Sequence, residues 1–182
     1  MQAVVSPILR LESRWNGAAE WIQELGISGR KRYGCSIEVN SDYQNRDLRW
    51  RTMLHELLHA HSVGLNRGDL LLYKGWEEGV VEKLQRLLRN TVLSQLGVVV
   101  DETILAGADS VHRYNSYIAE LERLRECFDT EDPTAFYIDL LKTPLPKRPD
   151  RIKVNGETLP SARRYVFDQT LMLCNARLRK PI

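Results

Sequence analysis

The chain has 182 residues, which suffice for one hydrophobic core but not for two domains of ordinary size. Hydrophobic residues make up 43% of it and charged residues 27%, a balance that argues against a disordered, fibrous or membrane-embedded protein. The 26 basic residues nearly match the 24 acidic ones, so the chain lacks the strong positive charge of a dedicated nucleic-acid-binding protein.

Targeting and redox signals favour a cytoplasmic protein. No apolar run is long enough to cross a membrane, and three charged residues within 10–14 interrupt the place where a secretory signal would continue. The three cysteines are far apart and lack any CxxC spacing, so we expect them to be reduced rather than joined in disulfides or bound to zinc. They are Cys35, Cys127 and Cys174.

The first half of the chain alternates helical and extended patterns. Apolar residues recur at helical spacing over 7–25, and the pattern predicts a helix of about five turns. Residues 35–40 alternate as a short strand does, and nothing breaks a helix over 47–63 before Gly64 ends it. A further helix is predicted from Gly75 to about residue 96.

The second half is predicted to contain two more large helices with a connector between them. Residues 98–100 fit a strand or a helix, whereas 111–127 has helical spacing. The proline-rich segment 143–149 predicts an extended connector, and 151–158 predicts a hairpin turning at Asn155-Gly156. A closing helix over 161–179, with Ser161 as its N-cap, completes one domain of residues 1–182.

The segment His55-Glu56-Leu57-Leu58-His59 matches the pattern HExxH. On a helix, two histidines four residues apart project from one face, so both imidazoles can bind the same metal ion. Glu56 lies beside them, where its carboxylate can take a proton from an attacking water and return it to a leaving amine. The pattern predicts a zinc-dependent hydrolase with Glu56 as its catalytic base.

A catalytic zinc site needs a third protein ligand, and Trp76-Glu77-Glu78-Gly79 offers two carboxylates for it. HELLH followed by WEEGVVEKL resembles the gluzincin branch of the zincin metallopeptidases. That resemblance implies zinc held by His55, His59 and Glu78, because Glu78 lies nineteen positions after His59, the separation in the leukotriene-hydrolase-like aminopeptidases. Glu77 is the competing ligand, and both carboxylates could instead be solvated at a helix start.

The resemblance also implies further parts of a zincin. Glu82 takes the position of the acidic residue that hydrogen-bonds the first histidine ligand, although an exposed Glu82 paired with Arg86 is the alternative. Ile37-Glu38-Val39 takes the place of the edge strand that pairs with extended substrate. The expected fold is therefore α+β and mainly helical, zincin-like, with a small edge-strand sheet packed on the HExxH helix.

A donor to the developing oxyanion is expected from outside the two motifs. The residues considered for that role are Tyr73 and a cluster on the predicted third helix, made of His112, Tyr114 and Tyr117. His61 faces away from the metal on a helix, because it lies only two residues beyond His59. Another type of protease with a similar histidine motif uses a third histidine downstream as its remaining metal ligand. In this chain no histidine suitable for that role precedes His112.

These residues predict a peptidase acting on peptides or proteins, with no membrane partner and no nucleic acid. Basic residues cluster in 29–32, at Lys147-Arg148 and at Arg163-Arg164, and are interpreted as solvated loops and helix faces. Two alternatives stay open: a zincin scaffold that binds a partner without turnover, and a protease effector of a phage or mobile element. The oligomeric state is left open.

Overall fold

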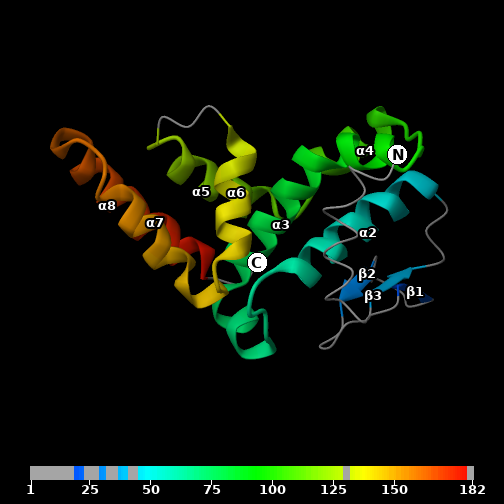
Figure 1. Cartoon of the computed structure of the whole chain (residues 1–182), viewed down its shortest axis with the longest axis horizontal. Coiled ribbons are helices and arrows are strands. Elements are labelled where there is room, and N and C mark those ends of the chain that lie inside the picture. Colours follow the sequence, from blue (N-terminus) through cyan, green and yellow to red (C-terminus); the bar gives the residue numbers. More distant parts are fainter. Residues whose placement is uncertain (1–18, 23–28, 32–36, 41–44, 129–131, 180–182) are drawn as a thin grey trace. The chain divides into compact units, whose positions relative to one another are not determined.

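The computed structural model describes residues 19–22, 29–31, 37–40, 45–128 and 132–179 (Figure 1). Within them, three short strands precede a long series of helices. The strands are β1 (Ala19–Ile22), β2 (Gly29–Lys31) and β3 (Ile37–Asn40). The helices are α2 (Arg46–His61), α3 (Arg67–Gln95), α4 (Glu102–Ser110), α5 (Asn115–Arg125), α6 (Pro133–Lys142), the 3-10 helix η1 (Leu145–Lys147), α7 (Arg148–Gly156) and α8 (Ser161–Leu178).

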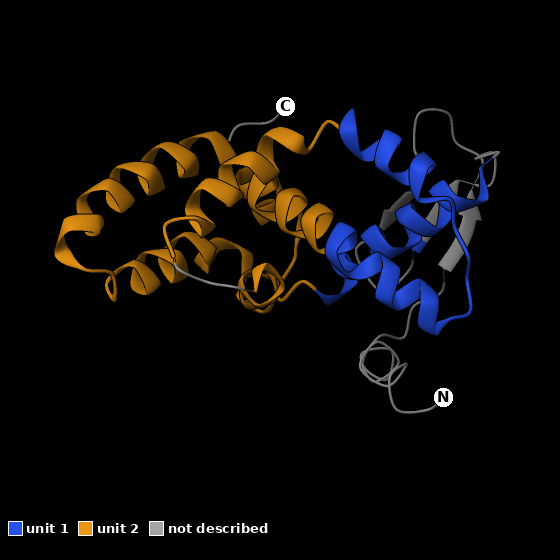
Figure 2. Ribbon diagram, turned by 90° about the horizontal axis from the view of Figure 1, so that it is seen from above, with its two compact units in different colours: residues 1–61, 85–111 blue, residues 62–84, 112–182 orange. Residues whose placement is uncertain are grey.

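The chain forms two compact units, which Figure 2 distinguishes by colour. The first contains residues 1–61 and 85–111, and the second contains 62–84 and 112–182. In the first unit, α2 contacts β2, β3 and α4, and a small apolar core surrounds Leu54, Val92 and Leu93. In the second unit, α8 contacts both α5 and α7.

The predicted α+β class is wrong, because helices build nearly all of the described structure and the fold is all-α in class. The strands are only three or four residues long. Their order is β1-β3-β2, with β3 parallel to β1 and antiparallel to β2. The prediction that residues 37–39 form a zincin-like edge strand is therefore wrong as well, since β3 lies between β1 and β2 and is paired on both sides.

The predicted helix over 7–25 is wrong where the structure describes it. Residues Ala19–Ile22 form β1 and pair in register with Ile37–Asn40, so pairing with β3 overrides the helical periodicity of this segment. The rest of the predicted helix lies outside the described residues. The short strand predicted at 35–40 is confirmed over Ile37–Asn40.

The helix that carries HExxH is confirmed as α2. Asn45 caps its first turn, because its side-chain oxygen accepts hydrogen bonds from the backbone N–H groups of Asp47 (2.8 Å) and Leu48 (3.3 Å). Asp47 also places a negative charge in the first turn, where the helix dipole favours it. Gly64, the predicted stop, lies shortly beyond the helix and has a φ of 68°, the left-handed conformation common after helix ends.

Helix α3 begins earlier than predicted, at Arg67 instead of Gly75. Asn66 caps this start by accepting a hydrogen bond from the N–H of Asp69 at 3.0 Å. The helix bends at Tyr73, whose φ of −126° and ψ of 28° are non-helical. Gly79 then lets α3 approach α5 closely, since an added Cβ would lie 2.7 Å from the Leu121 side chain.

The predicted hairpin over 151–158 is wrong, because Arg148–Gly156 forms α7. The extended connector predicted for 143–149 is wrong as well, because Leu145–Lys147 forms η1 and α7 begins at Arg148. Pro149 lies in the first turn of α7, where a missing N–H costs nothing. Gly156 does not serve a tight turn. It allows close packing on Phe167 of α8, whose ring would clash with any Cβ at this position.

Helix α8 belongs to the second unit and α4 to the first. The closing helix is confirmed as α8, although its N-cap is Pro160 and not the predicted Ser161. Helix α4 was not predicted from the sequence. Asp101 caps its start by accepting a hydrogen bond from the backbone N–H of Thr103 at 2.8 Å. Among the described residues, no helix combines the length and apolar character needed to span a membrane.

Candidate metal centre

His55 and His59 lie one turn apart on the same face of α2, and their ring nitrogens converge. The two Nε2 atoms are 3.1 Å apart and the ring planes are inclined by 78°. Both residues are buried, with 8% and 7% of their surface exposed. Two imidazole nitrogens on a tetrahedral zinc ion lie about 3.3 Å apart, given zinc–nitrogen distances of about 2.0–2.1 Å. The pair therefore has the spacing of two ligands of one ion.

Glu78 joins this pair. One ligand atom each from His55, His59 and Glu78 lies within 4.8 Å of the other two, and all three residues are buried. A buried carboxylate beside two imidazoles is a donor set that suits a divalent metal ion. The group can hold a metal ion, as the two motifs predict.

Tyr114 holds the carboxylate of Glu78. Arg113 donates a hydrogen bond to the Tyr114 hydroxyl oxygen at 2.8 Å, which leaves the hydroxyl proton free for Glu78. Burial and the negative charge of Glu78 raise the pKa of Tyr114 far above its usual range, so this hydroxyl stays protonated at neutral pH. Tyr114 was predicted to belong to a group of possible oxyanion donors, and its contact with Glu78 was not predicted from the sequence.

The competing carboxylate, Glu77, is engaged elsewhere. Its Oε2 atom lies 2.8 Å from Nη1 of Arg148 and accepts a hydrogen bond from the Ser62 hydroxyl, also at 2.8 Å. Arg148 also donates to Ser62 Oγ at 2.7 Å and to the backbone carbonyl of Trp76 at 2.9 Å. Glu77 is thus committed to a buried ion pair, and Glu78 is the residue of the two that joins the histidines.

Arg148 was predicted to lie in a solvated basic cluster, and this interpretation is wrong. Its side chain and that of Glu77 are both completely buried. Burial lowers the pKa of Arg148, but Glu77 counteracts this by charge and by hydrogen bonding. The alternative that Glu77 and Glu78 are solvated at the start of a helix is wrong too. Both residues are buried, and α3 starts ten residues before Glu77.

Glu56, the predicted catalytic base, has a buried side chain. It directly follows His55 on α2 and is 8% exposed. Its role as general base stays a prediction.

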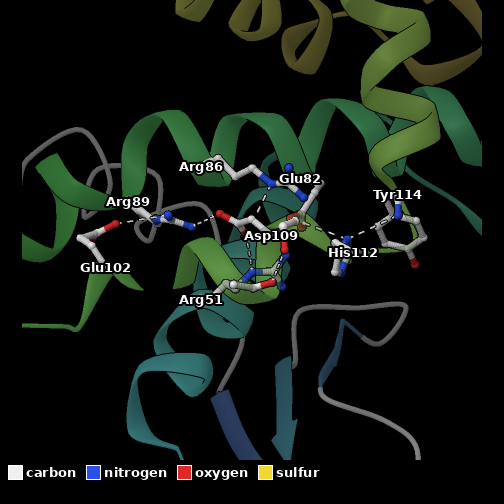
Figure 3. A network of polar contacts seen from close by, with 10 residues as sticks. Arg51, Glu82, Arg86, Arg89, Glu102, Asp109, His112 and Tyr114 are labelled. Atoms are coloured by element: carbon white, nitrogen blue, oxygen red, sulfur yellow. Dashed lines mark hydrogen bonds and ion pairs between the residues drawn. The ribbon is translucent and has the colours of Figure 1, made fainter. Parts of the chain in front are cut away.

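Glu82 is fully buried, so the alternative of an exposed Glu82 on the helix surface is wrong. Its Oε1 lies 3.7 Å from Nδ1 of His112, and the His112 ring makes an edge contact with that of Tyr114 (Figure 3). His112, predicted as a possible oxyanion donor, therefore lies against Glu82. The predicted second-shell role of Glu82 toward His55 stays a prediction.

Tyr73, the other predicted oxyanion donor, lies at the bend of α3. Its hydroxyl accepts a hydrogen bond from Arg179 at 3.0 Å, and the guanidinium of Arg179 stacks 4.5 Å from the ring centroid. These contacts occupy both the hydroxyl and one ring face with the end of α8. They give Tyr73 a structural role, and catalytic participation stays a prediction.

Comparisons of the chain with models of protein families, with curated proteins and with solved structures find no match. The metal centre therefore rests on the residues and geometry of this chain alone.

Proposed function

We propose that this protein is a zinc-dependent peptidase in which His55, His59 and Glu78 bind the metal and Glu56 is the general base. The observation that carries the proposal is the convergence of these three ligand atoms within 4.8 Å beside a buried carboxylate that follows His55 directly. A ligand set of two histidines and one glutamate is typical of catalytic zinc sites and leaves a coordination position for water.

Zinc bound there would polarise a peptide carbonyl and lower the pKa of an attacking water. The residues of the chain supply the rest. Glu56 accepts the proton of that water and returns it to the nitrogen of the leaving amine, so that one carboxylate acts as base and then as acid. Tyr114 keeps the carboxylate of Glu78 oriented by donating a hydrogen bond to it.

Replacing Glu56 by glutamine separates metal binding from turnover. We expect the Glu56→Gln variant to retain one equivalent of zinc and to lose roughly 10²–10⁴ in kcat, the usual contribution of a general base. The measurement is hydrolysis of a fluorogenic peptide library by zinc-loaded protein, with metal content determined by mass spectrometry.

Glu157→Gln, on the exposed surface just beyond α7, is the matched control and should keep the wild-type rate. Zinc-loaded wild type that cleaves no peptide would favour the alternative of a binding module without turnover. Full activity in Glu56→Gln would remove Glu56 from the mechanism.

A further inference from the structure

Three arginines surround one aspartate in the first unit. Asp109 of α4 lies 2.9 Å from Nε of Arg51 on α2 and 3.5 Å from Nε of Arg86 on α3, measured to its Oδ1 atom. Its Oδ2 atom accepts a short hydrogen bond from Arg89, one turn further along α3. Figure 3 shows Asp109 in the middle of this group, which we call the arginine triad.

The arginine triad is largely shielded from water. The side chains of Arg51 and Arg89 are each 9% exposed, and that of Arg86 is 20% exposed. Guanidinium groups lose hydration when they are buried and need an anion as a partner, and a carboxylate matches their planar geometry. The triad is thus a site that suits a carboxylate, the group that Asp109 supplies.

Buried polar atoms next to the triad lack partners. Nε of Arg89, and both the amide nitrogen and the amide oxygen of Gln85, are buried without a hydrogen-bond partner among the described residues. Gln85 is 1% exposed and lies one turn before Arg89 on α3. Buried polar groups are normally satisfied, so these atoms have bonding capacity left for a further ligand or ordered water.

Asp109 occupies the triad from an unfavourable place on its own helix. It lies in the last turn of α4, where the helix dipole disfavours a negative charge, and that turn holds no basic residue. Leu105 is the residue of α4 that is buried, while the Glu102 side chain that reaches Arg89 is 49% exposed. Ion pairs of Asp109 and Glu102 therefore contribute to holding α4, beside the buried Leu105.

The arginine triad lies close to the metal ligands along α2. Arg51 is four residues before His55 and eight before His59, so the three side chains follow each other on one helical face. The Cβ atoms of successive members of such a series are about 5–6 Å apart. In a peptide bound at His55 and His59, a side chain next to the bound residue can therefore reach Arg51.

We propose that Arg51, Arg86 and Arg89 form a subsite for an acidic side chain of the peptide substrate, and that Asp109 occupies this subsite until the substrate displaces it. The substrate assignment rests on the proposed peptidase function, whereas carboxylate binding by the triad does not. Asp109 then acts as an internal competitor. In the free protein Asp109 occupies the subsite, and peptides that carry glutamate or aspartate displace it best.

Chemical rescue tests the subsite without using turnover. In Asp109→Ala the arginines lose their carboxylate, and we expect the midpoint of thermal unfolding to fall by roughly 5–10 °C. Sodium acetate at 100 mM should restore at least half of this loss, and sodium chloride at equal ionic strength should not. EDTA is present throughout, so that acetate cannot act by binding a metal ion.

The rescue must depend on the triad. We expect acetate to leave both the wild type and the double variant Asp109→Ala/Arg89→Gln unchanged within about 1 °C. Asp109→Asn retains the side-chain volume and serves in the same assay if Asp109→Ala does not fold. Equal effects of acetate and chloride on the Asp109 variant would overturn the proposal.

Turnover gives the second readout. With zinc-loaded protein, Asp109→Asn should lower KM at least fivefold for a peptide carrying glutamate and leave KM unchanged for the same peptide carrying glutamine. Acetate rescue in a protein that hydrolyses nothing would contradict the peptidase function but keep the subsite. Hydrolysis with no rescue and no preference for glutamate would contradict the subsite alone.

Discussion

Glu78→Gln is expected to weaken zinc binding roughly a hundredfold or more, since even residues that only support a metal ligand contribute 10- to 100-fold. An amide oxygen carries no charge and coordinates zinc poorly, so two histidines remain as protein ligands. The affinity is measured by competition with a chromophoric zinc chelator. In EDTA, the variant should unfold within a few degrees of the wild type.

Glu77→Gln is the discriminating comparison, because the two glutamates are neighbours with opposite assignments. We expect Glu77→Gln to keep zinc affinity within about threefold of wild type and to unfold at a lower temperature, as it weakens the ion pair with Arg148. If the two variants exchanged these effects, Glu77 would be the ligand and Glu78 the structural residue.

Arg148→Met is expected to destabilise the protein by about 3–5 kcal/mol, because it leaves the carboxylate of Glu77 buried without its partner. It also removes donors to Ser62 and to the backbone carbonyl of Trp76. The free energy of unfolding from urea titration measures the effect.

The double variant Arg148→Met/Glu77→Leu identifies the cause. Replacing both members of a buried ion pair by apolar groups is often nearly neutral, so the double variant should recover most of the loss. A destabilisation below about 1 kcal/mol in Arg148→Met alone would contradict a fully desolvated ion pair.

The helix α2 and its metal ligands could be predicted because their signals are local. Spacing of four residues places His55 and His59 on one face of any α-helix, and Gly64 marks the end of the helix by a conformation that other residues avoid. Glu78 could be named from its distance in sequence within a pattern typical of gluzincins. Its burial could not, because α3 begins before the predicted start.

The strands and the C-terminal segment show where local signals fail. Ala19–Ile22 has helical periodicity but pairs with β3, and Asn155-Gly156 has a turn signal but ends α7 against Phe167. In both cases a contact distant in sequence decides the conformation. No pattern within a short window contains that contact.

The polar partners of the site could not be predicted from the sequence for the same reason. Arg148 follows a lysine in a proline-rich segment, which is typical of an exposed connector, yet it pairs with Glu77 far earlier in the chain. Asp109 pairs with Arg51 across 58 positions of sequence. A sequence indicates which residues can form ion pairs, but the fold selects which of them meet.

X-ray absorption spectroscopy of the zinc-loaded protein tests the coordination shell directly. We expect two imidazole nitrogens and two oxygens, one from Glu78 and one from water, at about 2.0–2.1 Å. In Glu78→Gln the imidazole scattering should persist while the oxygen contribution changes. A sulfur scatterer at about 2.3 Å, or a shell of oxygens without imidazole, would contradict the binding of zinc by His55, His59 and Glu78.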